Sequence, residues 1–179
     1  VAITAEYKTP AAHLGLRGLK LHIASVRCTP ETMFDMRLNS HSRLNLITAL
    51  LEAIEAGADE ALMLDPHGCI SSCNATNFFF VRGGEVLTST GDYCFHGITR
   101  RNVIELCRAD GIAIHCGHFG INDLGDADEA FVTGTMGGIT PVREIDGAHL
   151  PSIPGPLTSR IKALYESLKD AEATRRPAS

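Results

Sequence analysis

The sequence predicts a mixed α/β fold, in which three helices pack outside a single sheet. Short apolar segments with the alternation or composition of strands recur along most of the chain, and turn residues separate several of them. Three longer segments carry apolar residues at helical spacing. Hydrophobic residues make up 44% of the 179 residues and charged residues 21%, which is enough to bury a core and excludes a disordered chain.

The predicted strands share a high content of β-branched, aromatic and other apolar residues. In chain order they are Val1–Thr4, Leu19–Val26, Glu60–Leu64, Cys69–Ser72, Asn77–Arg82, Glu85–Thr88, Ile112–Cys116, Asp128–Thr133 and Ile139–Ile145. The segment Asn77–Arg82 is almost entirely apolar, which indicates burial on both faces. Gly83-Gly84 predicts a hairpin turn after it.

The first predicted helix follows from the spacing of four apolar residues, Leu44, Ile47, Leu51 and Ile54. Ser40 or Ser42 is the candidate N-cap, and Gly57 is the expected stop. The second and third helices are predicted over Thr99–Ala109 and Leu157–Leu168. A short helix or turn is expected at residues 122–125, and the polar residues 169–179 are expected to fray.

Charge and composition narrow the classes of partner. The formal net charge is −5 and the lysines and arginines are dispersed, which argues against nucleic acid. No apolar run is long enough to cross a bilayer, and no signal peptide opens the sequence, so no membrane partner is expected. The six cysteines form no CxxC pair and several lie in apolar runs, as in a reduced cytoplasmic protein.

Two glycine-containing segments resemble anion-binding elements. Gly97 can take backbone angles closed to other residues, and Thr99 is a good N-cap or first-turn residue for the helix that follows. The free amides and positive dipole at such a helix start favour a phosphate or carboxylate. The segment Thr133–Gly138 leaves a strand with small residues and two hydroxyls, and presents backbone amides in the same way. Together they indicate a possible phosphate site.

Several motifs resemble, in order and spacing, those of class IV aminotransferases, the pyridoxal-phosphate enzymes of fold type IV. The motifs are Glu60–Asp65, Asn77-Phe-Phe, Gly97-Ile-Thr-Arg100, Asp128-Glu-Ala-Phe-Val-Thr-Gly-Thr135, Thr140-Pro-Val142, Ile145-Asp-Gly147 and Gly155-Pro156. The resemblance extends from about Gly18 to Leu168. It implies a barrel-like mixed sheet with outer helices, and transfer of an amino group between an amino acid and an α-keto acid.

The resemblance also implies roles for individual residues. Ile98 and Thr99 correspond to phosphate ligands, as do Gly134 and Thr135 in the second segment, and Phe95 takes the position of an apolar side chain against the pyridine ring. The family has a smaller N-terminal domain and is typically homodimeric. We therefore expect residues 19–168 to form the cofactor-binding domain, and residues 1–18 to be the end of an absent N-terminal domain and a linker.

Two positions depart from the family pattern. The catalytic lysine, which bonds covalently to the cofactor, aligns with Asn39, and an asparagine amide can neither form that bond nor shuttle a proton. The glutamate that pairs with the ring nitrogen aligns with Ser72, a neutral hydroxyl. Lys20 is the nearest upstream lysine but matches no motif. The chain is therefore expected to be an impaired aminotransferase.

Other interpretations remain open. Arg43-Leu44 is similar to aminodeoxychorismate lyase, which allows a lyase, and the two departures allow a non-catalytic paralogue or fragment. His41 could act as an acid or base but is better explained as a surface or capping histidine. His115, Cys116 and His118 could suggest a metal, yet strand alternation separates neighbouring side chains, so no metal site is predicted.

Overall fold

A single mixed sheet of nine strands organises the computed structural model, which describes residues 17–175. The strands are β1 (Leu19–Ile23), β2 (Glu60–Leu64), β3 (Ile70–Cys73), β4 (Asn77–Arg82), β5 (Glu85–Ser89), β6 (Ile114–Gly117), β7 (Glu129–Gly134), β8 (Gly138–Ile145) and β9 (Ala148–His149). Their order is β3-β2-β1-β8-β7-β4-β5-β6, with β9 paired to β8. The pairs β1–β2, β1–β8 and β5–β6 are parallel, and the others are antiparallel.

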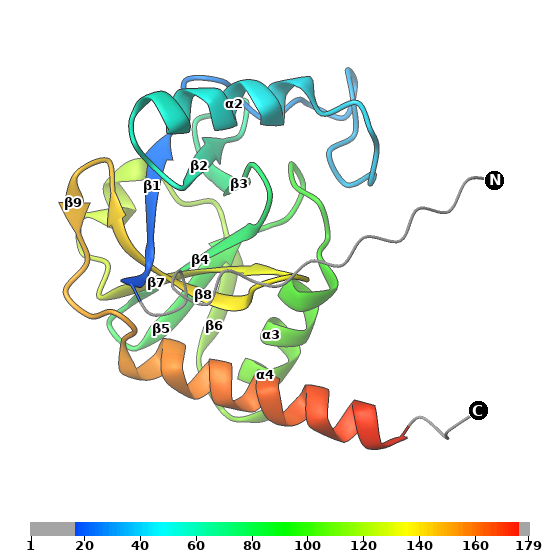
Figure 1. Cartoon of the computed structure of the whole chain (residues 1–179), viewed down its shortest axis with the longest axis vertical. Coiled ribbons are helices and arrows are strands. Elements are labelled where there is room, and N and C mark those ends of the chain that lie inside the picture. Colours follow the sequence, from blue (N-terminus) through cyan, green and yellow to red (C-terminus); the bar gives the residue numbers. More distant parts are fainter. Residues whose placement is uncertain (1–16, 176–179) are drawn as a thin grey trace.

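The helices cover the outside of this curled sheet, as the sequence predicts. They are α2 (Leu44–Glu55), α3 (Ile98–Ala109) and α4 (Pro156–Arg175), with a short 3-10 helix η1 (Ile121–Leu124). Figure 1 shows α2 on one side of the molecule and α4, with α3 beside it, on the opposite side. No helix within residues 17–175 is both long and apolar enough to span a membrane.

Strand β4 lies at the centre of the hydrophobic core. Phe78 and Phe80 pack with residues of β1, β2 and β7 in one cluster, whereas Phe79 and Val81 face α3 and α4 in another. All four side chains are at most 2% exposed. The prediction that this strand is buried on both faces is confirmed, because the sheet curls around one cluster and carries helices over the other.

Most predicted elements are confirmed, with differences at their ends. Strand β1 ends at Ile23 rather than Val26, and the short β9 was not predicted. The predicted strand Val1–Thr4 lies outside the described residues. Helix α4 continues to Arg175, so residues 169–175 are helical rather than frayed. Lys169 lies 2.6 Å from the carboxylate of Glu166 and over the ring of Tyr165, contacts that favour the helix there.

The apolar stripe that predicts α2 faces outward. The N-cap of α2 is Arg43, whose side chain forms no capping hydrogen bond, so the prediction that Ser40 or Ser42 caps the helix is wrong. Ser40 Oγ instead accepts a hydrogen bond from the backbone N–H of Ser42. Only the small residues Ala49 and Ala53 are fully buried against the neighbouring core. These small side chains allow the helix to approach the sheet closely. The larger apolar side chains of the stripe lie on the outer face and are exposed: Leu44, Ile47, Leu51 and Ile54.

Glu129 of β7 fixes the start of α4. Its two carboxylate oxygens accept the backbone N–H groups of Leu157 and Thr158, at 3.0 and 2.8 Å. Gly155 lies so close that a Cβ there would be 2.0 Å from Glu129 Cδ. A buried carboxylate at a helix N-terminus satisfies amides that have no partner within the helix and complements the helix dipole.

Candidate functional site

A cavity of about 370 Å³ opens between the segment before α2, the β3–β4 turn, the loop before α3 and the β7–β8 turn. All the residues that the sequence assigns to the site line this one cavity: Asn39, Ser72, Phe95, Ile98, Thr99, Gly134 and Thr135. They come from segments up to 96 positions apart in the chain, counted from Asn39 to Thr135. The fold therefore brings the two predicted anion-binding segments to the same space.

The start of α3 forms one wall of the cavity. The helix begins at Ile98 after the N-cap Gly97, and the amides of its first turn have no partner within the helix. Gly97 has φ −60° and ψ 139°, so it does not use the backbone angles that only glycine takes readily. Glycine is required there for space, because a Cβ would lie 2.5 Å from Asn77 Oδ1.

Thr99 lies in the first turn of α3 and is not its N-cap. Its hydroxyl is buried and lies 3.4 Å from the hydroxyl of Tyr165 on α4, so the side chain contacts the helix layer. The group that Thr99 presents at the helix start is consequently its backbone amide. This arrangement keeps the N-terminus of α3 anchored to α4.

The β7–β8 turn forms the opposite wall. Thr133, Gly134 and Thr135 all line the cavity, and a Cβ on Gly134 would lie 3.2 Å from Thr76 Cγ2. The Thr133 hydroxyl is buried and has no hydrogen-bond partner within residues 17–175. A buried hydroxyl without a partner is energetically unfavourable, so a polar ligand in the cavity would stabilise it. Sequence analysis did not single out Thr133 as a ligand, although it lies within the quoted motif.

Asn77 is a buried residue that organises the floor of the cavity. Its Nδ2 donates hydrogen bonds to the Phe95 carbonyl at 2.9 Å and to Ser72 Oγ at 3.2 Å. Ser72 in turn donates its hydroxyl proton to the Thr76 carbonyl, at 2.7 Å. The only proton of the Ser72 hydroxyl is thus donated within the protein. The hydrogen bond from Asn77 joins β4 to the loop that carries Phe95.

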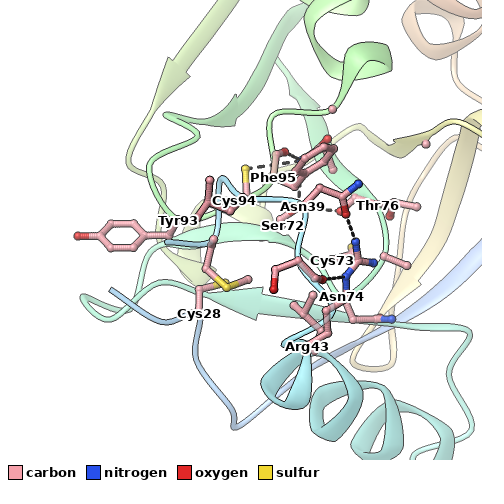
Figure 2. Close-up of a pocket in the computed structure, with 18 of the residues that line it drawn as sticks. Cys28, Asn39, Arg43, Ser72, Cys73, Asn74, Thr76, Tyr93, Cys94 and Phe95 are labelled. Atoms are coloured by element: carbon pink, nitrogen blue, oxygen red, sulfur yellow. Dashed lines mark hydrogen bonds between the residues drawn. The ribbon is translucent and has the colours of Figure 1, made fainter. Parts of the chain in front are cut away.

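Among the described residues, Arg43 is the only charged one that lines the cavity. Its guanidinium donates hydrogen bonds to the Asn39 side-chain oxygen and to the Ser40 carbonyl. Figure 2 shows Arg43 reaching from the start of α2 toward Asn39, on the side of the cavity that also holds Ser72 and Phe95. Asn39 therefore holds a cation at the mouth of the cavity, and no lysine, aspartate, glutamate or histidine of residues 17–175 lines it.

Three free thiols, Cys28, Cys73 and Cys94, also line the cavity. Burial raises the pKa of Cys28 to about 11, and burial also raises the pKa values of Cys73 and Cys94. Because the thiolate is the reactive form, burial disfavours a nucleophilic role for these three thiols.

The other candidates lie away from the cavity. Lys20 pairs with Glu144 at 3.0 Å on the sheet, and His41 is exposed and is not part of the lining. His115 packs edge-on against Phe119, whereas Cys116 packs against the α3–α4 side of the sheet. These two neighbours therefore face opposite sides of β6, as strand alternation predicts.

Comparison with known proteins identifies the family. Residues 1–145 match the amino-transferase class IV family. The chain is 35% identical over 176 residues to branched-chain-amino-acid aminotransferase-like protein 2 of Arabidopsis thaliana, a match that covers 98% of this chain and 31% of that protein.

Solved structures share the fold. A branched-chain aminotransferase from Thermoproteus uzoniensis with norvaline is 34% identical, with a TM-score of 0.81, over 87% of this chain and 52% of that one. An aminotransferase from Brucella abortus bound to the cofactor PLP is 32% identical, with a TM-score of 0.80, over 85% and 54%. This chain thus spans about a third to a half of the length of these relatives. By sequence motif, fold and family match, it belongs to the class IV aminotransferases.

Proposed function

We propose that this chain is the cofactor-binding domain of a class IV aminotransferase-like protein and binds pyridoxal 5'-phosphate without a covalent bond. The observation that carries the proposal is one cavity that both predicted anion-binding segments and Asn39 line, with no lysine of residues 17–175 in its lining. Amino transfer by this chain as it stands is consequently impaired.

The residues present fit the phosphate and the ring of this cofactor. The free amides at the start of α3, the β7–β8 turn and the unpartnered Thr133 hydroxyl supply hydrogen-bond donors for a phosphate. Phe95, which is 45% exposed and lines the cavity, offers an apolar face for the ring. The relative from Brucella abortus, which is bound to this cofactor, supports the same assignment.

The residues present do not fit the reacting part of the cofactor. Pyridoxal phosphate supplies an aldehyde that carries the amino group and a ring that withdraws electrons from the reacting carbon. Asn39 has no amine to bond the aldehyde or to move a proton, and its oxygen is used by Arg43. Ser72 uses its proton on the Thr76 carbonyl, so it has none to donate to the ring nitrogen. No catalytic step is therefore assigned to this chain.

The substrate class that suits this family is an amino acid with an α-keto acid acceptor. Two of the relatives named above are a branched-chain aminotransferase and a branched-chain-amino-acid aminotransferase-like protein. Arg43 at the cavity mouth also offers a cation for a substrate carboxylate. The lyase hypothesis gains no support from the relatives named above, because all of them are aminotransferases or a protein like one. The six free cysteines support a reducing compartment, and we place the protein in the cytoplasm.

Borohydride reduction in the presence of pyridoxal phosphate tests the proposal. Calorimetry should detect binding, and reduction followed by peptide mapping should find no label on the cavity lining. Asn39→Lys should acquire a label at position 39, because the amine then faces the cofactor. Ser42→Lys, which adds an amine elsewhere on the lining, is the control and should remain unlabelled at position 42.

Two results would contradict the proposal. Absence of any heat of binding in the full-length protein would remove the cofactor assignment. A saturating label on a lysine of the unmodified chain, such as Lys20, would show that Asn39 does not occupy the lysine position.

A further inference from the structure

A second group of chemically active side chains lies outside the cavity. Asp65 follows β2, Cys69 precedes β3 and His118 follows β6, and their potential ligand atoms all lie within 4.8 Å of one another. The sequence pattern drew attention to His118 only through its neighbours His115 and Cys116. The fold brings His118 instead to two residues about fifty positions earlier in the chain.

Backbone hydrogen bonds hold these three residues in place. The N–H of Ile70, next to Cys69, donates to the carbonyl of Phe119, next to His118, at 2.7 Å. The N–H of Asp65 donates to the Cys69 carbonyl at 2.7 Å. The two segments are thus joined immediately beside the side chains in question. A site organised by its backbone needs little rearrangement to bind a ligand.

Asp65 is a buried carboxyl side chain whose only hydrogen-bond donors in the described part of the chain are backbone amides. It is 3% exposed, and it forms no ion pair within residues 17–175. Its Oδ1 accepts the backbone N–H groups of His67 and Cys69, at 2.8 and 2.9 Å, while Oδ2 accepts no hydrogen bond from the same part of the chain. One oxygen of this carboxylate is thus committed to the turn and the other is available to a ligand, and carboxylate oxygens are common ligands of metal ions.

We propose that Asp65, Cys69 and His118 form a binding site for a divalent transition metal of the zinc class. A thiolate, an imidazole and a carboxylate are the ligand types that Zn²⁺ takes in proteins. Binding transfers the Cys69 thiol proton to solvent and forms a metal–sulfur bond, with no change of oxidation state. His118 is exposed and Cys69 half-buried, so water reaches the fourth coordination position.

The site would clamp two segments that lie beside Tyr93, a residue that borders the cofactor cavity. Asp65 and His118 both line a shallow cleft with Tyr93, and Tyr93 also lines the main cavity. His67, inside the β2–β3 turn, lies 3.2 Å from the Tyr93 hydroxyl. A metal bound there would therefore stabilise the β2–β3 turn against the segment after β6, and raise the thermal stability of the metal-loaded protein.

Titration of the metal-free protein with Co²⁺ tests the proposal, because Co²⁺ substitutes for Zn²⁺ and its bond to sulfur produces a characteristic near-ultraviolet absorption. We expect one equivalent to bind with this band and Zn²⁺ to displace it. Cys69→Ser should abolish the band. His118→Gln should weaken binding by more than about 100-fold, since even residues behind the ligands typically contribute 10–100-fold.

Cys116→Ser is the matched control, because Cys116 is also a half-exposed free thiol but packs away from the cluster. It should bind Co²⁺ as the unmodified protein does. A band that persists in Cys69→Ser, or that disappears in Cys116→Ser, would overturn the proposal, as would absence of stoichiometric binding. His118 is exposed, so His118→Gln should fold normally, and unchanged Co²⁺ affinity in that variant would equally contradict the site.

Discussion

The Thr133 hydroxyl distinguishes a ligand site from an ordinary turn. It is 1% exposed, lines the cavity and has no hydrogen-bond partner within residues 17–175. Thr133→Val removes the hydroxyl with little change of shape, so the free energy of unfolding without ligand should stay equal or rise by up to about 1 kcal/mol. Affinity for pyridoxal phosphate should fall about tenfold, because a hydrogen bond to a charged group is lost.

Thr158→Val provides the control for this comparison. Thr158 is 0% exposed, and its hydroxyl also lacks a partner in the described part of the chain, but it lies on α4 outside the cavity. Calorimetric titration should give unchanged cofactor affinity for this variant. Equal affinities for both variants would show that Thr133 does not contact the ligand.

At the scale of the elements, the contact between Glu129 and Gly155 joins β7 to α4. Gly155→Ala would place a Cβ 2.0 Å from Glu129 Cδ and displace the carboxylate from the amides that it caps. We expect a loss of about 3 kcal/mol in the free energy of unfolding, measured by urea denaturation. Gly120→Ala should have little effect, since its Cβ would meet no atom closer than 3.8 Å.

A double-mutant cycle separates the two parts of this effect. Glu129→Ala alone loses the cap, and adding Gly155→Ala should then cost much less than in the unmodified protein, because the clashing carboxylate is gone. Additive losses would show that Gly155 acts independently of Glu129. The two residues belong to separate motifs of the sequence, and the structure supplies a physical reason for their joint presence.

At the largest scale, the outward stripe of α2 is an exposed apolar surface. Leu44, Ile47, Leu51 and Ile54 are each at least 53% exposed and lie on one helix face, an arrangement that is unfavourable in water unless it is covered. We propose that a second copy of the chain covers it. Leu51→Glu should therefore shift the protein from dimer to monomer in sedimentation velocity experiments.

Ile121→Glu is the control for this experiment, because Ile121 is an apolar residue that is 43% exposed and belongs to η1 rather than to α2. It should leave the dimer intact. A monomer at all concentrations in the unmodified protein would contradict the proposal. Dissociation by both substitutions would instead indicate a general effect of added charge.

Local sequence patterns were enough to predict most of the helices and strands and to locate the candidate site. Helix α2 could be predicted from the spacing of its apolar residues, and β4 from its continuous apolar run. Both patterns involve only residues that are close together in the chain. The motifs around Gly97 and Thr133 also indicated anion-binding segments, and every residue assigned to the site lines the same cavity. Helix starts and glycine turns present backbone amides through local geometry alone, so such segments can be recognised from sequence, and their binding of a phosphate stays a prediction.

Local sequence does not show which distant residues meet or which faces of the helices and strands are covered. The spacing of Leu51 and its neighbours predicts a helix but not that small Ala49 and Ala53 would form its buried face. Nor does local sequence show that Glu129 caps α4, or that His118 lies beside Asp65 and Cys69. Each of these contacts depends on how the curled sheet brings separate segments together, and that arrangement is set by packing of the whole core rather than by any local pattern.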